Sequence, residues 1–403
     1  MIVISHERFM SFLRLAKAGG LCGILLLSRP LLYAIFSRQR DLSAYSSVDA
    51  SAIVFILYAV VCFYFSIREI NKQDSIFAHK LLAKSPLLWF ALYTLLGMAS
   101  IFWSVNPPLS GFRAFECLSM MLLMIATVHY LFSTNELEIV IDWSILFVSV
   151  DIIVSLIKAL SYTTNISDLL QTSQMMATVY FFMALYYTPK RWYHYMIGIM
   201  SFFSMSTVAY LGMAIGSIST FFGKPQYRVW VFLFSLILCT VIGYIGPYKF
   251  VKDTVFFDKQ SISIHETTGR DKIMYVAASA LSDKPEGYGF FAGEPYLLYT
   301  KKLGAINGHN SFISASISLG YAGIILLLIF FLKMFCTTFS RYIPPEYRAP
   351  LIGCFLVGFL QCMGNPGLGS RVYGGWIPVM FLFTLICGFY VNNKFHDMNY
   401  DEV

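Results

Sequence analysis

Apolar residues occur along almost the whole chain in continuous runs, and they do not alternate with polar residues as they would in a half-buried strand. Runs of about 17 to 25 apolar residues are long enough for a helix to cross the hydrocarbon core of a membrane. A helix is the expected form, because it satisfies every backbone amide within its own segment. About twelve such runs predict transmembrane helices near residues 13–36, 48–67, 85–104, 112–132, 138–160, 172–188, 192–205, 207–223, 227–246, 309–335, 349–364 and 373–391.

A long polar insert separates the ninth predicted helix from the tenth. We therefore expect transmembrane helices 1–9 in residues 1–246, one long loop in residues 247–308, transmembrane helices 10–12 in residues 309–391 and a cytoplasmic tail in residues 392–403. Two boundaries are weakly marked in the pattern. Arg29-Pro30 interrupts the first run, and Ser204-Met205-Ser206 divides a weakly polar stretch that forms either one long helix or two short ones.

Basic residues predict the orientation, because short loops rich in Lys and Arg stay on the cytoplasmic side during insertion. They gather after the even-numbered helices, at Arg68, Lys72, Lys80, Lys84, Lys190, Arg191, Lys224, Arg228, Arg341 and Arg348. This distribution places the amino terminus inside and the loop 247–308 outside, although Arg38 and Arg40 do not fit it. The first apolar run lacks a small-residue cleavage site, so we interpret it as an uncleaved span.

Composition supports an all-α polytopic membrane protein, since 57% of the residues are hydrophobic and only 13% are charged. The 8 cysteines lie in or beside predicted spans, which disfavours a disulfide framework or a cysteine metal site. The chain has no Gly-rich phosphate loop, CxxC or HExxH, and we expect no cofactor and no metal. The net charge of +7 is spread over short loops, which suits anionic membrane lipids and not nucleic acid.

Within the outer loop, the stretch Thr268-Gly269-Arg270-Asp271 has the signals of a helix start, with a threonine cap and an acidic residue three positions later. The helix is amphipathic, so we expect it to lie along the membrane surface or against the protein's own core. Pro285 to Gly289 should end it. Its predicted apolar face consists of Ile273, Met274, Val276, Ala277, Ala280 and Leu281, and its polar face of Asp271, Lys272, Ser279 and Ser282.

Arg270 is a candidate phosphate ligand because of its position in the first turn of this helix. Unpaired amides and the helix dipole attract an anion there, and a guanidinium can hold phosphate with two parallel hydrogen bonds. The alternative is that Arg270 pairs with Asp271, Glu266 or solvent.

His309 lies where the polar loop becomes a predicted span, within Asn307-Gly308-His309-Asn310-Ser311. An imidazole at this position can accept or donate a proton near neutral pH. The alternative is an interfacial histidine that bonds a backbone carbonyl.

Charged residues inside predicted spans cost about 2.5 to 3.5 kcal/mol on insertion scales, so they should face the interior of the bundle. Arg113 and Glu116 lie one turn apart, and Asp151 and Lys158 lie two turns apart. Structural ion pairs are one interpretation of both sets. Arg113 also lies just below a predicted outer loop, where it could face the same side as Arg270.

Three stretches of the chain together resemble the O-antigen ligase and polymerase superfamily of membrane glycosyltransferases. They are Ser100 to Pro108 leading to Arg113, Gly269-Arg270 through Pro285 to Phe290, and Gly308 to Phe312 through Leu319 to Gly323. The resemblance implies a GT-C-like fold in the bacterial inner membrane with its active site facing the periplasm. It also implies a metal-independent, inverting transfer of glycans that are carried on undecaprenyl diphosphate.

The resemblance implies a role for particular residues. Arg270 would bind the donor diphosphate, and His309 would act as general base or contact the acceptor hydroxyl. Asn310 and Tyr288 are possible acceptor contacts. Many relatives have a Ser-Arg pair where this chain has Ser206-Thr207. Either the second cation comes from Arg113, Arg371 or Lys272, or the diphosphate is held differently.

The Pro-x-Gly-Tyr-Gly-Phe turn and the Trp-Ser-x-x-Pro stretch look more like those of polysaccharide polymerases than like those of ligases. The expected partners are an undecaprenyl-diphosphate-linked oligosaccharide, a glycan acceptor, membrane lipids and a chain-length regulator. The alternatives are a ligase that transfers the glycan to lipid A core, and a lipid-linked oligosaccharide flippase or other transporter. The chain shows no repeat between its halves, which favours an enzyme over a transporter.

Overall fold

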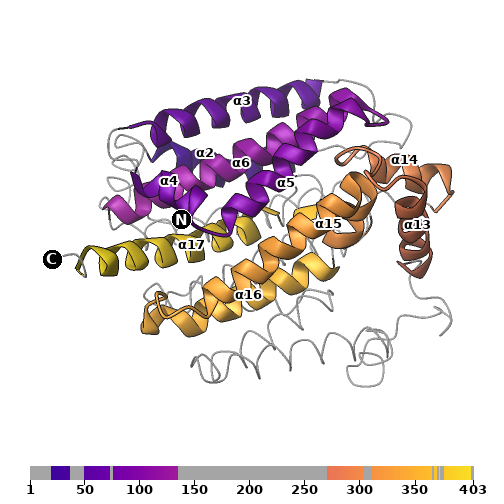
Figure 1. Ribbon diagram of the computed structural model, residues 1–403. Helices are drawn as coiled ribbons and strands as arrows, with labels where there is room; N and C mark the ends of the chain where they lie inside the picture. The colour runs from indigo at the N-terminus through magenta and orange to yellow at the C-terminus, as the bar shows by residue number, and fades with distance from the viewer. Residues whose placement is uncertain are drawn as a thin grey trace, which may run out of the picture.

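The computed structural model describes residues 20–36, 50–72, 76–134, 270–303, 308, 310–364, 367–369, 372 and 376–400 (Figure 1). Within these residues all regular structure is helical, as predicted. The helices are α2 (Leu21–Phe36), α3 (Ala50–Ile70), α4 (Ile76–Ala83), α5 (Leu87–Ala99), η2 (Ser100–Phe102), α6 (Pro107–Thr134), α13 (Arg270–Asp283), α14 (Gly293–Thr300), α15 (Ser311–Thr338), α16 (Pro345–Gly364), η4 (Gly367–Gly369) and α17 (Trp376–Tyr400).

Several of these helices can cross a membrane, which makes the protein a multi-pass membrane protein. In the described part of the chain, 4 helices are long and apolar enough to span, and the α4–α5 pair brings the number to 5 if it counts as one bent span. The single helices span Ala52–Ile70, Pro107–Thr134, Ser311–Thr338 and Trp376–Phe395. The predicted spans between residues 138 and 246 lie outside the described residues.

The structure differs from the prediction at three helix boundaries. Residues 76–83, predicted as part of a cytoplasmic loop, form α4, which meets α5 at an angle of 75°. This short helix forms because Ala78 and Leu81 are buried against the bundle, and Pro86 marks the bend. The helix α6 begins at Pro107, ahead of its predicted start at residue 112, and α17 extends into the predicted tail as far as Tyr400, whereas α2 continues through Pro30 as the predicted span 13–36 does.

The helix α6 is the centre of the bundle. It packs against α2, α3, α4, α5 and α17, and 83% of its most apolar window is buried. Only 33% of the corresponding window of α3 is buried, and α3 lies on the outside of the bundle in Figure 1. Its exposed apolar side chains suit contact with lipid, and they are Ile53, Ile56, Leu57, Val60, Val61 and Tyr64.

The helices align so that the bundle has two chemically different ends. At one end, Lys80 lies over the ring of Phe395, and the Asn393 side chain donates to the Tyr342 carbonyl. This basic end is on the left in Figure 1, where α4 and the start of α16 meet α17, and it holds Arg68, Lys72, Lys80, Lys84, Arg341, Arg348 and Lys394. At the opposite end, residues 284–292 contact the turn between α5 and α6, and Asn310 contacts Met363. The candidate residues of the described part lie toward this second end.

Candidate functional site

A break in α15 receives the loop that follows α13. Gly320 has φ 62° and ψ −150°, which interrupts the helical hydrogen bonds. The carbonyls of Ile317 and Ser318 accept instead from the amides of Tyr288 and Gly289, both at 2.9 Å. Breaks in transmembrane helices need such replacement partners, because no water is available in the hydrocarbon region. The loop therefore supplies the hydrogen-bond donors that α15 lacks at its break.

The same loop is bonded on its other side to the turn between α5 and α6. The amide of Val105 donates to the Tyr288 carbonyl at 3.0 Å, and Trp103 Nε1 donates to the Glu286 carbonyl at 3.1 Å. Lys284 Nζ in turn donates to the Trp103 carbonyl at 2.9 Å. Parts of the three stretches that carry the family resemblance thus lie together, although the bonded residues Trp103 and Glu286 are 183 positions apart in the sequence.

Two glycines permit this close approach. A Cβ on Gly289 would collide with Ser104, and a Cβ on Gly320 would collide with the Pro285 carbonyl. Both glycines have positive φ, at 105° and 62°, which other residues rarely adopt. We call this contact of residues 285–290, 103–105 and 317–321 the loop junction.

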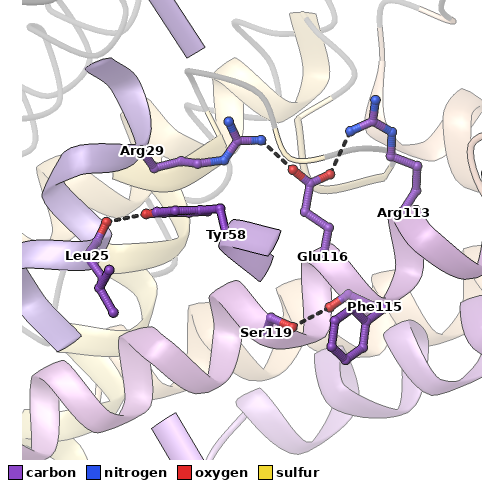
Figure 2. A network of polar contacts seen from close by, with 7 residues as sticks. All are labelled: Leu25, Arg29, Tyr58, Arg113, Phe115, Glu116 and Ser119. Atoms are coloured by element: carbon purple, nitrogen blue, oxygen red, sulfur yellow. Dashed lines mark hydrogen bonds and ion pairs between the residues drawn. The ribbon is translucent and has the colours of Figure 1, made fainter. Parts of the chain in front are cut away.

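Beside the loop junction, Glu116 of α6 binds two arginines (Figure 2). One carboxylate oxygen accepts from Arg113 at 2.7 Å, and the other accepts from Arg29 of α2. Arg29 and Glu116 are each only 2% exposed, whereas Arg113 is 18% exposed. The predicted pairing of Arg113 with Glu116 is confirmed, and the structure adds Arg29 as a partner from another helix.

Aromatic rings connect this charge cluster to the loop junction. The guanidinium of Arg113 lies 5.3 Å from the ring centre of Phe291 and 5.0 Å from that of Phe112. Phe291 follows the loop junction directly and has a positive φ of 57°, which is uncommon for a residue with a side chain. Arg113 is therefore placed between the bundle interior and the loop.

The start of α15 is fixed on both sides of His309, which itself lies outside the described residues. Before it, the Gly308 amide donates to the buried carboxylate of Glu294 at 3.0 Å. After it, the Asn310 side chain caps α15 by accepting from the Phe312 amide at 2.7 Å. The Asn310 amide group also donates to the Met363 carbonyl at 3.0 Å. The predicted acceptor contact Asn310 thus has a structural role as a helix cap.

The amphipathic helix predicted in the insert is α13, and it packs on the protein's own core. Its buried stripe of Val276, Ala277 and Ala280 contacts Leu297 and Ile317. Met274, which we assigned to the apolar face, is 59% exposed and lies outside this buried stripe. At 100° per residue Met274 lies at the edge of a stripe that centres on Ile273.

Arg270 is the first residue of α13, and its side chain lies outside the described residues. Lys272, two residues later, is exposed. The loop junction follows the opposite end of α13, and a helix of 14 residues is about 20 Å long. The described contacts therefore bring Arg113 and Tyr288 into one neighbourhood, and they do not connect either of them with Lys272.

Tyr288 is half-buried at the loop junction, with its ring 6.3 Å from that of Tyr296. The Lys284 ammonium lies 5.3 Å from the Tyr288 ring centre. Burial, with the nearby charge of Asp283, raises the pKa of Tyr288 above its usual value. Its hydroxyl is neutral near pH 7 and can donate a hydrogen bond to a ligand.

Sequence reasoning missed Arg29 and Glu294 as members of the site. Arg29 had a recognisable signal, because an arginine within an apolar run needs a partner. Glu294 had none, since an acidic residue in a polar loop is ordinarily solvated. Neither of their contacts follows from spacing along the chain.

Comparisons with known proteins add no assignment. No family model matches the chain, and no curated protein matches it. No group of three or more His, Cys, Asp or Glu that could hold a metal occurs among the described residues. The structure itself defines the class of protein. It is a multi-pass helical membrane protein with a buried charge cluster beside a broken helix.

Proposed function

We propose that the protein is a polysaccharide polymerase, an inverting glycosyltransferase of the bacterial inner membrane that joins repeat units carried on undecaprenyl diphosphate. The observation that carries this proposal is the loop junction. Stretches that resemble the O-antigen ligase and polymerase superfamily are far apart in the sequence, yet they are bonded together beside the charge cluster. Arg113 lies beside these stretches, 5.3 Å from the Phe291 ring centre, and a lipid diphosphate requires such a cation.

The basic residues of the short loops support a periplasmic site, and the Lys and Arg residues of the long loop 247–308 do not count, because the positive-inside rule governs long loops poorly. The basic end of the bundle has the residues that remain in the cytoplasm by the positive-inside rule. The loop junction and the start of α15 lie at the opposite end. In this orientation both would face the periplasm.

The proposed reaction is a direct displacement. The acceptor hydroxyl oxygen attacks the anomeric carbon of the donor sugar as the bond from that carbon to the diphosphate oxygen breaks. His309 takes the proton of the hydroxyl, and undecaprenyl diphosphate leaves with the bonding electron pair. Arg270, together with Arg113 or Lys272, would stabilise the charge that develops on the leaving group. Asn310 and Tyr288 would contact the acceptor.

A ligase that transfers the polymer to lipid A core would use the same displacement with another acceptor. A flippase or transporter is the alternative of another class, and the broken helix α15 is a feature that transporters share. In transporters, however, freed carbonyls often coordinate the transported ion. Here the carbonyls of Ile317 and Ser318 are already bonded to the loop amides, which favours the enzyme.

The proposal is tested by deleting the gene and resolving lipopolysaccharide and secreted polysaccharide by size. We expect long chains to disappear while a single repeat unit remains on the core, or exopolysaccharide to be lost while core-attached glycan is intact. Unmodified core with polymer accumulating on undecaprenyl diphosphate would instead identify a ligase. An unchanged glycan profile would refute both.

Complementation with variants tests the assigned residues. Arg270→Ala should abolish chain growth at an unchanged protein level. Arg270→Lys should restore little of the chain growth, because an ammonium group cannot form the two parallel hydrogen bonds of a guanidinium. His309→Ala should reduce turnover far more than donor binding. Glu69→Gln, which removes an ion pair at the basic end, is the control and should leave the polymer normal. Normal polymer with Arg270→Ala would contradict its role in diphosphate binding.

A further inference from the structure

The two arginines that share Glu116 are not equivalent. Arg29 and Glu116 are both almost completely buried, at 2% exposure. The Arg29 guanidinium also lies 4.4 Å from the ring centre of Phe55, within the bundle. Arg113 is 18% exposed and contacts Phe291 at the edge of the loop junction. Arg29 is thus the interior partner of the carboxylate, and Arg113 is the partner nearest the outside.

This arrangement determines which of the two arginine–Glu116 ion pairs can be broken with the smaller loss of free energy. Removing the only partner of a buried charge is strongly unfavourable, because the remaining charge is neither solvated nor compensated. Glu116 has one partner on each oxygen, so the loss of Arg113 would leave the carboxylate bonded to Arg29 (Figure 2). Arg113 can therefore leave Glu116 without leaving a buried, uncompensated carboxylate.

Arg113 also has unused capacity for an anion. Its Nε is buried and has no hydrogen-bond acceptor in the part of the chain that the structure describes. Glu116 accepts a hydrogen bond from Nη1 of Arg113 and from no other atom of this guanidinium. The edge formed by Nε and Nη2, which can donate two parallel hydrogen bonds to a phosphate, is therefore not used by the carboxylate. The rings of Phe112 and Phe291 restrict the guanidinium from the sides.

We propose that Arg113 is an exchangeable phosphate ligand, and that Arg29 and Glu116 are its positioning residues. In the free protein Glu116 holds Arg113 in place. When a lipid phosphate arrives, Arg113 transfers to it and Glu116 remains paired with Arg29. The inference rests on the proposed function only in naming the lipid as the diphosphate donor. The chemistry recognised is a phosphate group, and an ordinary phospholipid headgroup or free pyrophosphate would present it as well.

The test measures binding of radiolabelled undecaprenyl diphosphate to the purified full-length protein in neutral lipid nanodiscs. Arg113→Ala should weaken binding by about tenfold or more, as expected for loss of hydrogen bonds to a charged group. Arg29→Met should also weaken binding, because Glu116 then has only Arg113 and retains it. The double variant Arg29→Met/Glu116→Gln removes the interior pair and frees Arg113, so its affinity should return to within about threefold of the wild type.

Rescue by the double variant distinguishes positioning from a purely structural role. If Arg29 only holds helices together, removing Glu116 as well cannot restore binding, and a double variant as weak as Arg29→Met would overturn the proposal. Equal binding by wild type and Arg113→Ala would also overturn it. Glu69→Gln is the matched control, since Glu69 forms an ion pair of the same i,i+3 spacing with Lys72 at 2.5 Å. It should bind as the wild type does, and thermal unfolding of every variant verifies that it is folded.

Competition identifies the source of the phosphate. Displacement of the labelled undecaprenyl diphosphate by inorganic pyrophosphate supports recognition of the phosphate group. Its displacement by phosphatidylglycerol at the same concentration as the pyrophosphate would overturn the assignment of the site to the diphosphate donor. The assay needs no acceptor and no polymer, so its outcome is independent of the glycan profile. Unaltered binding by Arg113→Ala refutes this inference alone, and an unchanged profile after gene deletion refutes the proposed function alone.

Discussion

At the scale of single residues, the charge cluster separates what spacing can predict from what only the fold can show. Arg113 and Glu116 are three residues apart on one helix, and helical geometry alone indicates that they meet. Arg29 reaches the same carboxylate from 87 residues away. The sequence indicates that an arginine inside an apolar run needs an ion-pair partner, but only the packing of the helices determines which carboxylate that partner is.

Removing the shared carboxylate should be far more damaging than removing a carboxylate whose partner is exposed to solvent. Glu116→Ala removes the anion that Arg29 and Arg113 share within the bundle, and we expect a loss of about 3 to 5 kcal/mol in the free energy of unfolding. Thermal unfolding in detergent and the protein level in membranes measure this effect.

Glu69→Ala is the comparison, because its partner Lys72 is 48% exposed. Solvent screening should limit that loss to about 1 kcal/mol or less. Equal stability of the two variants would show that the Glu116 cluster is not buried in the folded protein.

At the scale of elements, long apolar runs predicted the spanning helices well, and short or interrupted segments less well. The helices α6 and α15 cover predicted runs with shifts of about five residues or fewer at their ends, whereas α17 runs well past its predicted end at residue 391 as far as Tyr400. The helix α4 was missed because its apolar residues lie between lysines in a segment that has the composition of a loop. The break at Gly320 was not predicted as a break, because a single glycine is tolerated inside an apolar helix.

The loop junction depends on that glycine. Gly320→Ala adds a methyl group where the Pro285 carbonyl lies and requires a left-handed backbone, which costs about 1 to 3 kcal/mol. We expect the loop to separate from α15 and a glutamate-specific endoprotease to cut after the exposed Glu286 faster than in the wild type.

Gly23→Ala is the control for this experiment. A Cβ at Gly23 makes an ordinary contact at 3.4 Å with Thr127, so the cleavage rate should not change. Equal protection of the Glu286–Gly287 bond in both variants would contradict the structural role of Gly320.

At the scale of the whole molecule, the sequence correctly predicted a helical multi-pass protein, and the structure adds the division into two ends. The family resemblance named the three stretches, but only the fold shows that their backbones are bonded to one another. The residues assigned to chemistry divide into two groups, with Arg113 and Tyr288 at the loop junction and Arg270 and Lys272 on α13. His309 and the predicted spans between residues 138 and 246 remain predictions.

The two ends should be on opposite sides of the membrane. Asn71 and Glu286 are exposed residues at the basic end and at the loop junction, respectively. In intact cells with a permeable outer membrane, an impermeant maleimide should label Glu286→Cys and not Asn71→Cys.

Lysis should make both introduced cysteines reactive, which provides the internal control. The wild type should remain unlabelled at these positions, and its signal is subtracted as background. Labelling of Asn71→Cys in intact cells would invert the orientation and place the loop junction in the cytoplasm.

The hydrogen bonds between the loop amides and the broken helix limit where the chain can change in length. Tyr288 and Gly289 are held by Ile317 and Ser318 in fixed register, so one residue added between Lys284 and Phe290 would misalign every bond of the set. Insertions that precede Arg270 would not disturb this register. Natural variants of this protein should therefore differ in loop length before α13 and keep the spacing from Lys284 to Phe290 constant.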